Sequence, residues 1–230
     1  MHAEDLAKTI DHTLLTPTAT AADIDRLCRE AIEHHFAAVC VFPYFVARCD
    51  SLLKAADVKV CSVISFPYGA DTARAKMAAA EDAVASGADE IDVVINIPAL
   101  FSGQFGQVRD DLASVVRAAR MRSVNSGRGN VTVKAIIETC YLTTALKKLT
   151  CRICEQAGVD FVKTSTGCGP RGATVQDVAL LRDCLGEDIG VKASGGIRTV
   201  RDVELMINAG AARIGTSAGV AIVRELLEAS

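Results

Sequence analysis

VTVKAII at residues 131–137 and IDVVI at residues 91–95 are almost wholly apolar runs of strand length. Runs of this kind are typical of a parallel sheet that is covered on both faces by helices. Six further segments have the length and the flanking turn residues of strands. The eight expected strands are Lys8–Thr13, Ala37–Phe42, Val58–Phe66, Glu90–Asn96, Val131–Glu138, Val159–Ser165, Gly190–Ser194 and Ala212–Thr216.

The spacing of these strands predicts the architecture. Eight strands in 230 residues leave about 29 residues for each unit, enough for one strand, one helix and two loops. Thr20, Thr174 and Thr199 each precede an aspartate by three residues, a variant of the capping box that marks a helix start. No composition shift divides the chain. We therefore expect one domain of the α/β class, residues 1–230, folded as a single (β/α)8 TIM barrel, with a doubly wound open sheet as the alternative.

Composition argues against several classes of partner. Half of the residues are hydrophobic, 23% are charged and the net charge is −3, so we expect no nucleic-acid partner, which would need a concentrated basic surface. The lack of tryptophan argues against a base-stacking platform. No apolar run is long enough to span a membrane, and the first residues do not resemble a signal peptide. The nine cysteines fit small buried side chains in a reducing, cytoplasmic setting.

Three lysines recur at intervals of 29 residues: Lys134, Lys163 and Lys192. Each lies within an apolar strand segment, although an unpaired ammonium is costly to bury. Alternation along a strand places them opposite their valine neighbours, on the face toward the barrel interior. Asp92 has the same character within residues 90–96. The sequence thus predicts one carboxylate and three amines inside the barrel; a purely structural ion-pair network is the alternative.

Crowded amines indicate nucleophilic catalysis. A second ammonium and partial desolvation both favour the neutral form of a lysine, whose ordinary pKa is about 10.4. A neutral lysine attacks carbonyl groups and forms a Schiff base. The protonated imine withdraws electrons, so an adjacent carbon–carbon bond can break, and a nearby carboxylate acting through water can move the protons. This chemistry requires no metal and no organic cofactor, and we expect neither.

Two glycine-rich loops follow the seventh and eighth expected strands. SGGIR (Ser194–Arg198) precedes the helix start at Thr199, and GTSAG (Gly215–Gly219) opens the last helix. In (β/α)8 barrels these loops and the helix N-termini after them commonly bind phosphate. Glycine lets backbone N–H groups approach the phosphate oxygens. The pattern favours a phosphorylated substrate, and glycines that only permit tight turns are the alternative.

Two weaker patterns compete with this interpretation. The spacing G-x-G-x-x-G at residues 167–172 matches a dinucleotide fingerprint, but it lies late in the chain and contains Pro170. Cys151 and Cys154 lie one helical turn apart, without a second pair at zinc-ribbon spacing. We expect ordinary loop and helix residues at both places, with a nicotinamide-dependent dehydrogenase and a redox pair as the alternatives.

The combination of FVKTSTG (Phe161–Gly167) with VKASGGIR (Val191–Arg198) resembles the 2-deoxyribose-5-phosphate aldolase family. The resemblance extends along the chain, in the family's order, through DHTLL (residues 11–15), AVCVFPYFV (38–46), GADEIDVVIN (87–96), KAIIET (134–139) and RIGTS (213–217). It implies a class I aldolase on a (β/α)8 barrel. Such an enzyme reversibly cleaves 2-deoxy-D-ribose 5-phosphate to D-glyceraldehyde 3-phosphate and acetaldehyde during deoxynucleoside breakdown.

The resemblance also implies roles for individual residues. Lys163 would form the Schiff base, Lys192 would lower its pKa, and Asp92 would serve a water-mediated proton relay. Lys134 and Asp11 would support this network, while Thr13 and Cys40 would line the pocket. The residues implied to hold the substrate phosphate are Gly167, Gly195, Gly196, Gly215 and Ser217.

Some features depart from the family or leave alternatives open. Cys168 stands where some members have a phosphate-binding lysine, and Ala218 replaces a second serine of the last loop. Both changes weaken the expected grip on phosphate. The resemblance implies a homodimer or homotetramer acting on a small sugar phosphate and an aldehyde. Another Schiff-base barrel of the transaldolase type, and a catalytically silent phosphate-binding barrel, remain the alternatives.

Overall fold

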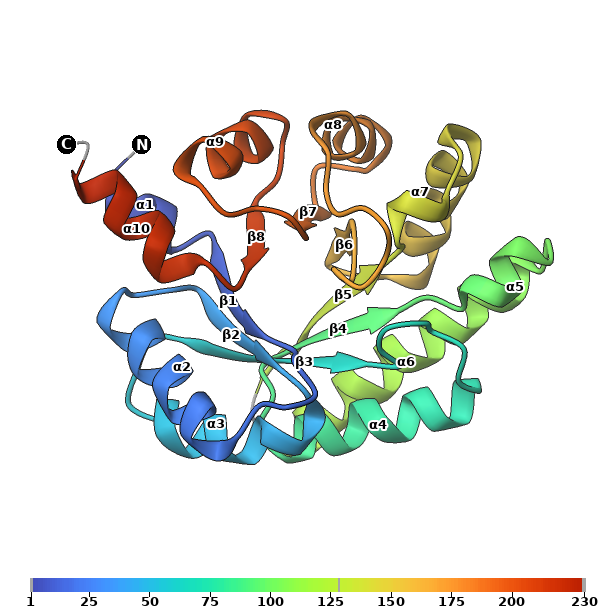
Figure 1. The fold of residues 1–230 in the computed structure, drawn as a ribbon. Coiled ribbons are helices and arrows are strands. Elements are labelled where there is room, and N and C mark those ends of the chain that lie inside the picture. The colour runs from blue at the N-terminus through green and yellow to red at the C-terminus, as the bar shows by residue number, and fades with distance from the viewer. Residues whose placement is uncertain (1, 128, 229–230) are drawn as a thin grey trace.

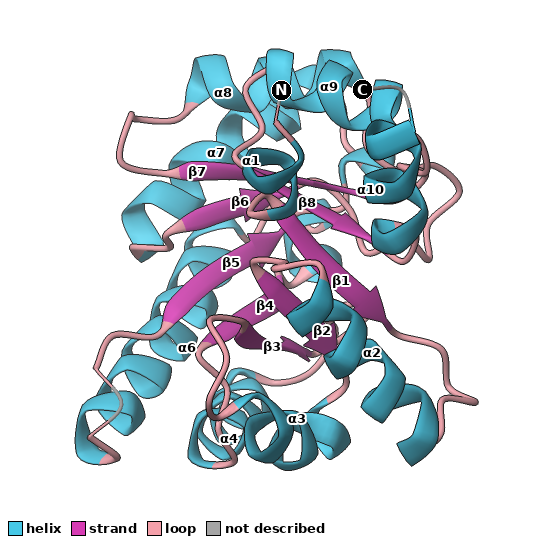
Figure 2. Cartoon of the chain, turned by 90° about the vertical axis from the view of Figure 1, so that its left-hand side faces the viewer, coloured by secondary structure: helices cyan, strands magenta, loops and turns pink. Residues whose placement is uncertain are grey.

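Eight parallel strands form the centre of the computed structural model, which describes residues 2–127 and 129–228. They pair in sequence order, and β8 pairs with β1, so the sheet closes into a barrel (Figures 1 and 2). The strands are β1 (Ile10–Leu14), β2 (Ala38–Val41), β3 (Lys59–Ile64), β4 (Glu90–Val94), β5 (Thr132–Ile136), β6 (Phe161–Lys163), β7 (Gly190–Ser194) and β8 (Arg213–Thr216). The predicted (β/α)8 barrel is confirmed, and the alternative of an open sheet is wrong.

Helices follow every strand and surround the barrel, as Figure 2 shows. The α-helices are α1 (Ala3–Ala7), α2 (Ala21–Glu33), α3 (Val46–Leu53), α4 (Ala73–Ala85), α5 (Ile97–Phe101), α6 (Phe105–Asn125), α7 (Thr144–Ala157), α8 (Val175–Cys184), α9 (Val200–Asn208) and α10 (Gly219–Glu228). Two 3₁₀ turns, η1 (Pro43–Phe45) and η2 (Thr139–Tyr141), follow β2 and β5. The short helix α1 precedes the first strand and packs against α10.

Helix starts follow the capping pattern. Thr20 and Thr199 form complete capping boxes, in which the threonine hydroxyl accepts the N–H of the aspartate three residues later and the aspartate carboxylate accepts the threonine N–H. Thr174 accepts the N–H of Asp177 in the same way. The carboxylate of Asp177 instead binds Lys147 and Arg171, so this third box is only half formed.

Strand β6 is shorter than the expected Val159–Ser165. The N–H of Val159 bonds to Cys154 O at 3.4 Å and so closes the end of α7. After Lys163, the hydroxyls of Thr164 and Ser165 bond to each other at 3.1 Å, and the chain turns into a loop. The observed strand, Phe161–Lys163, is therefore two residues shorter than expected at each end.

The core has two parts because side chains alternate across the sheet. Val39 and Val41 of β2 belong to the large cluster between the barrel and its helices, whereas Ala38 and Cys40 belong to a small cluster. The small cluster consists of Ala38, Cys40, Cys61 and Val63 and lies inside the barrel on β2 and β3. Charged side chains from the other strands occupy much of the remaining interior, and these side chains form the site described below.

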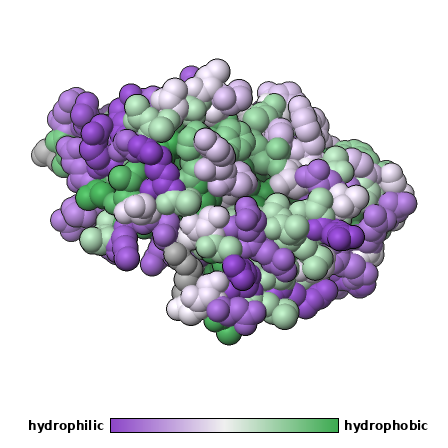
Figure 3. Space-filling view, turned by 90° about the horizontal axis from the view of Figure 1, so that it is seen from below, coloured by the Kyte–Doolittle hydropathy of each residue, from purple (hydrophilic) through white to green (hydrophobic). Residues whose placement is uncertain are grey.

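None of the helices in residues 2–127 and 129–228 combines the length and apolar character that a membrane span requires. The face in Figure 3, seen from the side of α2, α3 and α4, mixes hydrophilic residues with separate groups of hydrophobic ones.

Candidate active site

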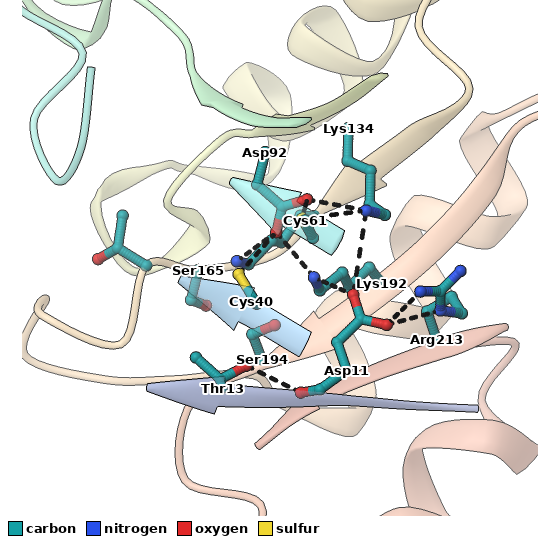
Figure 4. Close-up of polar contacts among 12 residues, drawn as sticks. Asp11, Thr13, Cys40, Cys61, Asp92, Lys134, Ser165, Lys192, Ser194 and Arg213 are labelled. Carbon is teal, nitrogen blue, oxygen red and sulfur yellow. Dashed lines mark hydrogen bonds and ion pairs between the residues drawn. The ribbon is translucent and has the colours of Figure 1, made fainter. Parts of the chain in front are cut away.

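Seven ionisable side chains meet inside the barrel. They are the three carboxylates of Asp11, Glu90 and Asp92 and the four bases Lys134, Lys163, Lys192 and Arg213. Figure 4 shows Asp92, Lys134, Lys192, Asp11 and Arg213 directed toward one another from different strands. If all seven are ionised, the cluster carries one positive charge in excess. The predicted meeting of Asp92 with the three lysines is therefore present in the structure.

Asp92 lies at the centre of this cluster and is inaccessible to solvent. Its Oδ2 accepts hydrogen bonds from Lys163 Nζ at 2.8 Å and Lys192 Nζ at 2.7 Å, and its Oδ1 accepts one from Lys134 Nζ at 3.0 Å. Burial by itself raises the pKa of a carboxyl group. The three ammonium groups outweigh burial, so the pKa of Asp92 lies well below its usual range and the group is an anion.

Lys192 is held as an ammonium. It donates to Asp11 and Asp92, and Asp11 in turn binds Arg213, whose Nε lies 2.7 Å from Asp11 Oδ1. Burial disfavours the charge on Lys192, but the two carboxylates prevail and raise its pKa above the ordinary range. Lys192 and Lys163 are partners in the register of β6 and β7, so this ammonium lies beside the amine of Lys163.

Lys134 lies deeper in the barrel than its equal spacing in the sequence suggests. The register pairs Lys134 with Phe161, whereas Lys163 pairs with Ile136 two residues further along β5. Lys134 binds Glu90 as well as Asp92, and its Nζ lies 3.5 Å from Cys61 Sγ. Burial lowers the pKa of Lys134, yet the surrounding negative charges raise it well above its usual range.

Glu90 and Arg213 are members of the cluster that the sequence analysis missed. Arg213 Nη1 donates to Glu90 Oε1 at 3.2 Å, across 123 positions of the chain. The sequence did contain a signal that both side chains face the barrel interior. Alternation along β4 places Glu90 on the face of Asp92, and alternation along β8 places Arg213 on the face of Gly215.

A cavity of about 440 Å³ opens at the carboxyl ends of the strands. Its lining includes Thr13, Lys163 and all five residues expected to hold phosphate: Gly167, Gly195, Gly196, Gly215 and Ser217. Lys163 is the one lysine among the described residues that line it. The lining also includes Phe66, Thr166, Ser194 and Arg198, to which the sequence analysis assigned no role. Ser194 and Arg198 are the first and last residues of the SGGIR segment.

Positive backbone φ angles account for two of the glycines. Gly167 has φ +87° and Gly196 has φ +81°, and a Cβ at either position would meet no atom within 4 Å. These two glycines therefore leave space on the cavity side while adopting a conformation that other residues rarely adopt. Glycine at position 215 is explained by close packing instead, because a Cβ there would lie 2.3 Å from Ser194 Oγ.

Cys40 does not line this cavity, contrary to the expectation. It is fully buried in the small cluster inside the barrel, and its Sγ lies 4.0 Å from Asp92 Oδ2. Alternation along β2 directs it inward as expected. Although its register partner Thr13 lines the cavity, the Cys40 side chain instead lies beside the ion cluster.

Other cysteines and glycines have structural roles. Burial raises the pKa of Cys151 to about 12 and that of Cys154 well above its usual range, so neither favours the reactive thiolate. Within the G-x-G-x-x-G pattern, a Cβ on Gly172 would lie 2.1 Å from Gly195 O, so this glycine lets two cavity loops pack together. That close contact explains why residue 172 is a glycine, and a bound dinucleotide is not needed to explain it.

Cys40, Cys61 and Asp92 bring three potential metal-ligand atoms within 4.8 Å of one another. Both oxygens of Asp92 are already bound to ammonium groups, and Lys134 Nζ lies 3.5 Å from Cys61 Sγ. A divalent cation would have to enter among these positive charges, so the residues do not fit a metal ion.

Comparisons with known proteins agree with this geometry. The sequence profile of the DeoC/LacD family of aldolases matches residues 6–229. A deoxyribose-phosphate aldolase of Thermoanaerobacter sp. (strain X514) is 52% identical over 221 residues, which cover 96% of each chain. The Staphylococcus carnosus deoxyribose-phosphate aldolase is 50% identical over 222 residues, covering 96% of this chain and 97% of the relative.

A solved structure extends the comparison to three dimensions. The tetrameric deoxyribose phosphate aldolase of Aeropyrum pernix superposes with a TM-score of 0.89 at 34% identity, covering 100% of this chain and 94% of the other. Sequence profile, relatives and fold therefore agree, and the chain belongs to the DeoC/LacD family of aldolases.

Proposed function

We propose that this aldolase reversibly cleaves 2-deoxy-D-ribose 5-phosphate to D-glyceraldehyde 3-phosphate and acetaldehyde, as a step in deoxynucleoside breakdown. One observation carries the proposal. Among the residues that the structure describes, Lys163 is the single lysine lining a cavity whose other wall consists of glycine-rich loops, and an ammonium and a carboxylate lie directly behind it. The names of the relatives support the choice of substrate.

The ion pairs of the cluster distinguish Lys163 from the other three bases. Lys134, Lys192 and Arg213 each contact at least two carboxylates. Within residues 2–127 and 129–228, Lys163 contacts one, that of Asp92, which it shares with the other two lysines. Lys163 therefore has the fewest carboxylate contacts of the four bases and is the one at the cavity, so we assign it the attack on the substrate carbonyl.

The neutral amine of Lys163 attacks C1 of the open-chain sugar, and loss of water gives a protonated imine. The C2–C3 bond then breaks as the C3 hydroxyl loses its proton, and the electron pair of that bond moves into the imine to form an enamine. Glyceraldehyde 3-phosphate leaves. Protonation of the enamine at C2 and hydrolysis of the resulting imine release acetaldehyde and restore the amine.

Lys192 and Asp92 support these steps from behind the amine. Lys192 keeps its positive charge beside Lys163, its partner in the register of β6 and β7. Asp92 is closed off from the cavity, so we assign it the positioning of both amines and the movement of protons through them rather than direct contact with the sugar. Asp11 and Lys134 complete the ion pairs that hold these groups.

We assign the phosphate of the substrate to Gly167, Gly195, Gly196, Gly215 and Ser217. These residues belong to the loops after β6, β7 and β8, and all of them line the cavity that contains Lys163. Backbone N–H groups and the hydroxyl of Ser217 supply the donors, and Arg198 adds a positive charge on the same wall. Thr13 faces this wall from β1.

Borohydride trapping tests the proposal. The protein is mixed with 2-deoxyribose 5-phosphate and reduced with sodium borohydride, and the modified peptide is mapped by mass spectrometry. We expect an adduct on the peptide that carries Lys163, and none in Lys163→Arg. Lys147→Arg is the matched control, because Lys147 is a buried lysine paired with Asp177 outside the barrel. This control should keep both the adduct and the activity.

Two outcomes would overturn the proposal. The first is an adduct retained in Lys163→Arg. The second is cleavage of a ketose phosphate without cleavage of 2-deoxyribose 5-phosphate, which would favour a transaldolase-type enzyme. A folded protein that gives no adduct with either sugar or with acetaldehyde would instead support a silent phosphate-binding barrel.

We further propose that the chain acts as one catalytic domain in the cytoplasm and assembles as a homodimer or homotetramer. The closed barrel supports the first point, and nine free cysteines support a reducing compartment. The tetramer of the Aeropyrum pernix relative supports the oligomeric assembly. Light scattering of the purified protein tests the assembly, and a monomer at all concentrations would contradict it.

A further inference from the structure

Glu138 is a buried carboxylate that the proposed mechanism does not use. It follows β5, at the end of the barrel where the cavity opens, and is 2% exposed. Its backbone adopts the left-handed conformation, with φ 51° and ψ 68°. Residues other than glycine seldom adopt this conformation, and when they do, it often serves a functional site.

The carboxylate of Glu138 holds the loop that follows β6. Its Oε2 accepts hydrogen bonds from the hydroxyl of Thr166 and from Thr166 N, the latter at 3.2 Å. The Thr166 hydroxyl in turn accepts the N–H of Cys168 at 3.0 Å. Both neighbours of Gly167 are therefore anchored, directly or through one hydroxyl, to the same carboxylate.

The loop also lies directly over the side chain of Glu138. A Cβ at Gly169 would lie 3.3 Å from Glu138 Oε1 and 2.8 Å from Cys140 Sγ. Glycine at position 169 thus lets the backbone approach the carboxylate closely. Thr166, Gly167 and Cys168 all line the cavity, so the surface opposite this contact faces the substrate.

Glu138 has no positive partner among the ion pairs of residues 2–127 and 129–228. A buried carboxylate is costly unless hydrogen bonds compensate for the lost water. Here the compensating donors come mainly from the loop after β6, with a longer contact from Cys140 Sγ at 3.6 Å. An apolar side chain would fill this place without that cost, so the carboxylate serves the loop rather than the packing.

We propose that Glu138 is a positioning residue that orients the loop Thr166–Gly169 toward the phosphate group of the substrate. The inference rests on the proposed function, because it assigns the phosphate to this loop. The charge of Glu138 fixes the Thr166 hydroxyl, and that hydroxyl fixes Cys168 N. Gly167 lies between these anchors, so its N–H keeps one direction before the substrate arrives.

Steady-state kinetics with two sugars test the inference. Glu138→Gln keeps the size of the side chain but loses the charge, and Glu138→Asn tolerates the left-handed backbone but is one methylene too short. We expect each variant to raise KM for 2-deoxyribose 5-phosphate by about tenfold, the effect of one charge-assisted hydrogen bond. The same variants should leave kcat/KM for unphosphorylated 2-deoxyribose within about twofold. Inhibition by inorganic phosphate should weaken in parallel.

Glu155→Gln is the matched control. The carboxylate of Glu155 accepts the N–H of Gly186 at 2.7 Å, in a loop before β7 at the opposite end of the barrel. This variant should leave both sugars unaffected. An equal loss on both sugars in Glu138→Gln would show a merely structural role and overturn the inference, as would unchanged KM values. A wild-type protein inactive on 2-deoxyribose 5-phosphate would instead count against the proposed function itself.

Discussion

Replacement of Asp92 by asparagine tests the charge balance of the barrel interior. The variant keeps the shape of the side chain but removes the anion that binds Lys134, Lys163 and Lys192 at 3.0, 2.8 and 2.7 Å. Two carboxylates would then face four bases. Because Asp92 is inaccessible to solvent, water cannot take over its role.

The expected loss of stability is large. Removing one partner of a buried ion pair costs about 3–5 kcal/mol, a substantial part of the 5–15 kcal/mol typical of a folded domain. With a urea slope of about 3 kcal/mol per molar, the midpoint of unfolding should fall by about 1–1.7 M. Activity should fall by about 10²–10⁴-fold, because Lys163 loses the carboxylate that it contacts.

The effect also depends on pH with a definite sign. The pKa of Asp92 is lowered in the folded state, so its contribution to stability is fully present above the unfolded pKa, about 3.9. That contribution is lost as the pH falls through the folded value. The difference between wild type and Asp92→Asn should therefore be full at pH 7 and begin to shrink below about pH 4.

Urea unfolding of both proteins, followed by circular dichroism between pH 3.5 and 7, measures these quantities. Asp110→Asn is the control, because Asp110 is an exposed carboxylate whose Oδ1 lies 2.8 Å from Arg109 Nη2. Exposed pairs contribute only about 0–1 kcal/mol. Equal midpoints for the two variants, or a difference that does not change with pH, would refute the argument that Asp92 balances the interior charges.

Three further predictions follow from local geometry. Thr20→Ala removes a complete capping box and should lower the free energy of unfolding by about 1 kcal/mol without changing activity; a fall in kcat would show that α2 affects the site. Cys168 is the one exposed thiol of the nine, so it should react first with a thiol reagent, and the rapid phase should vanish in Cys168→Ser; several thiols reacting at the same rate would contradict this. Gly196→Ala places a Cβ in the cavity at φ +81° and should cost about 1–2 kcal/mol of stability while raising KM for the phosphorylated sugar. An unchanged KM would argue against phosphate binding at this glycine.

The sequence by itself determined the order of the elements and the faces of the strands. Apolar runs, capping threonines and glycine-rich loops are local signals, because hydrogen bonding and side-chain direction within a few residues produce them. Alternation along β4, β6 and β7 was enough to direct Asp92, Lys163 and Lys192 inward. The resemblance to known aldolases then added roles that local patterns do not carry.

Only the tertiary structure decided which side chains meet and at what depth. The register of the closed barrel pairs Lys134 with Phe161 rather than with Lys163, and the folded interior brings Cys40 to Asp92 rather than to the cavity. It also brings Arg213 to Glu90 across 123 positions, and Glu138 to Thr166 across 28. Such contacts depend on the stagger between neighbouring strands, which closure of the whole barrel sets. A period of two along one strand indicates the face of a side chain, but it carries no information about the level of that side chain on the barrel axis.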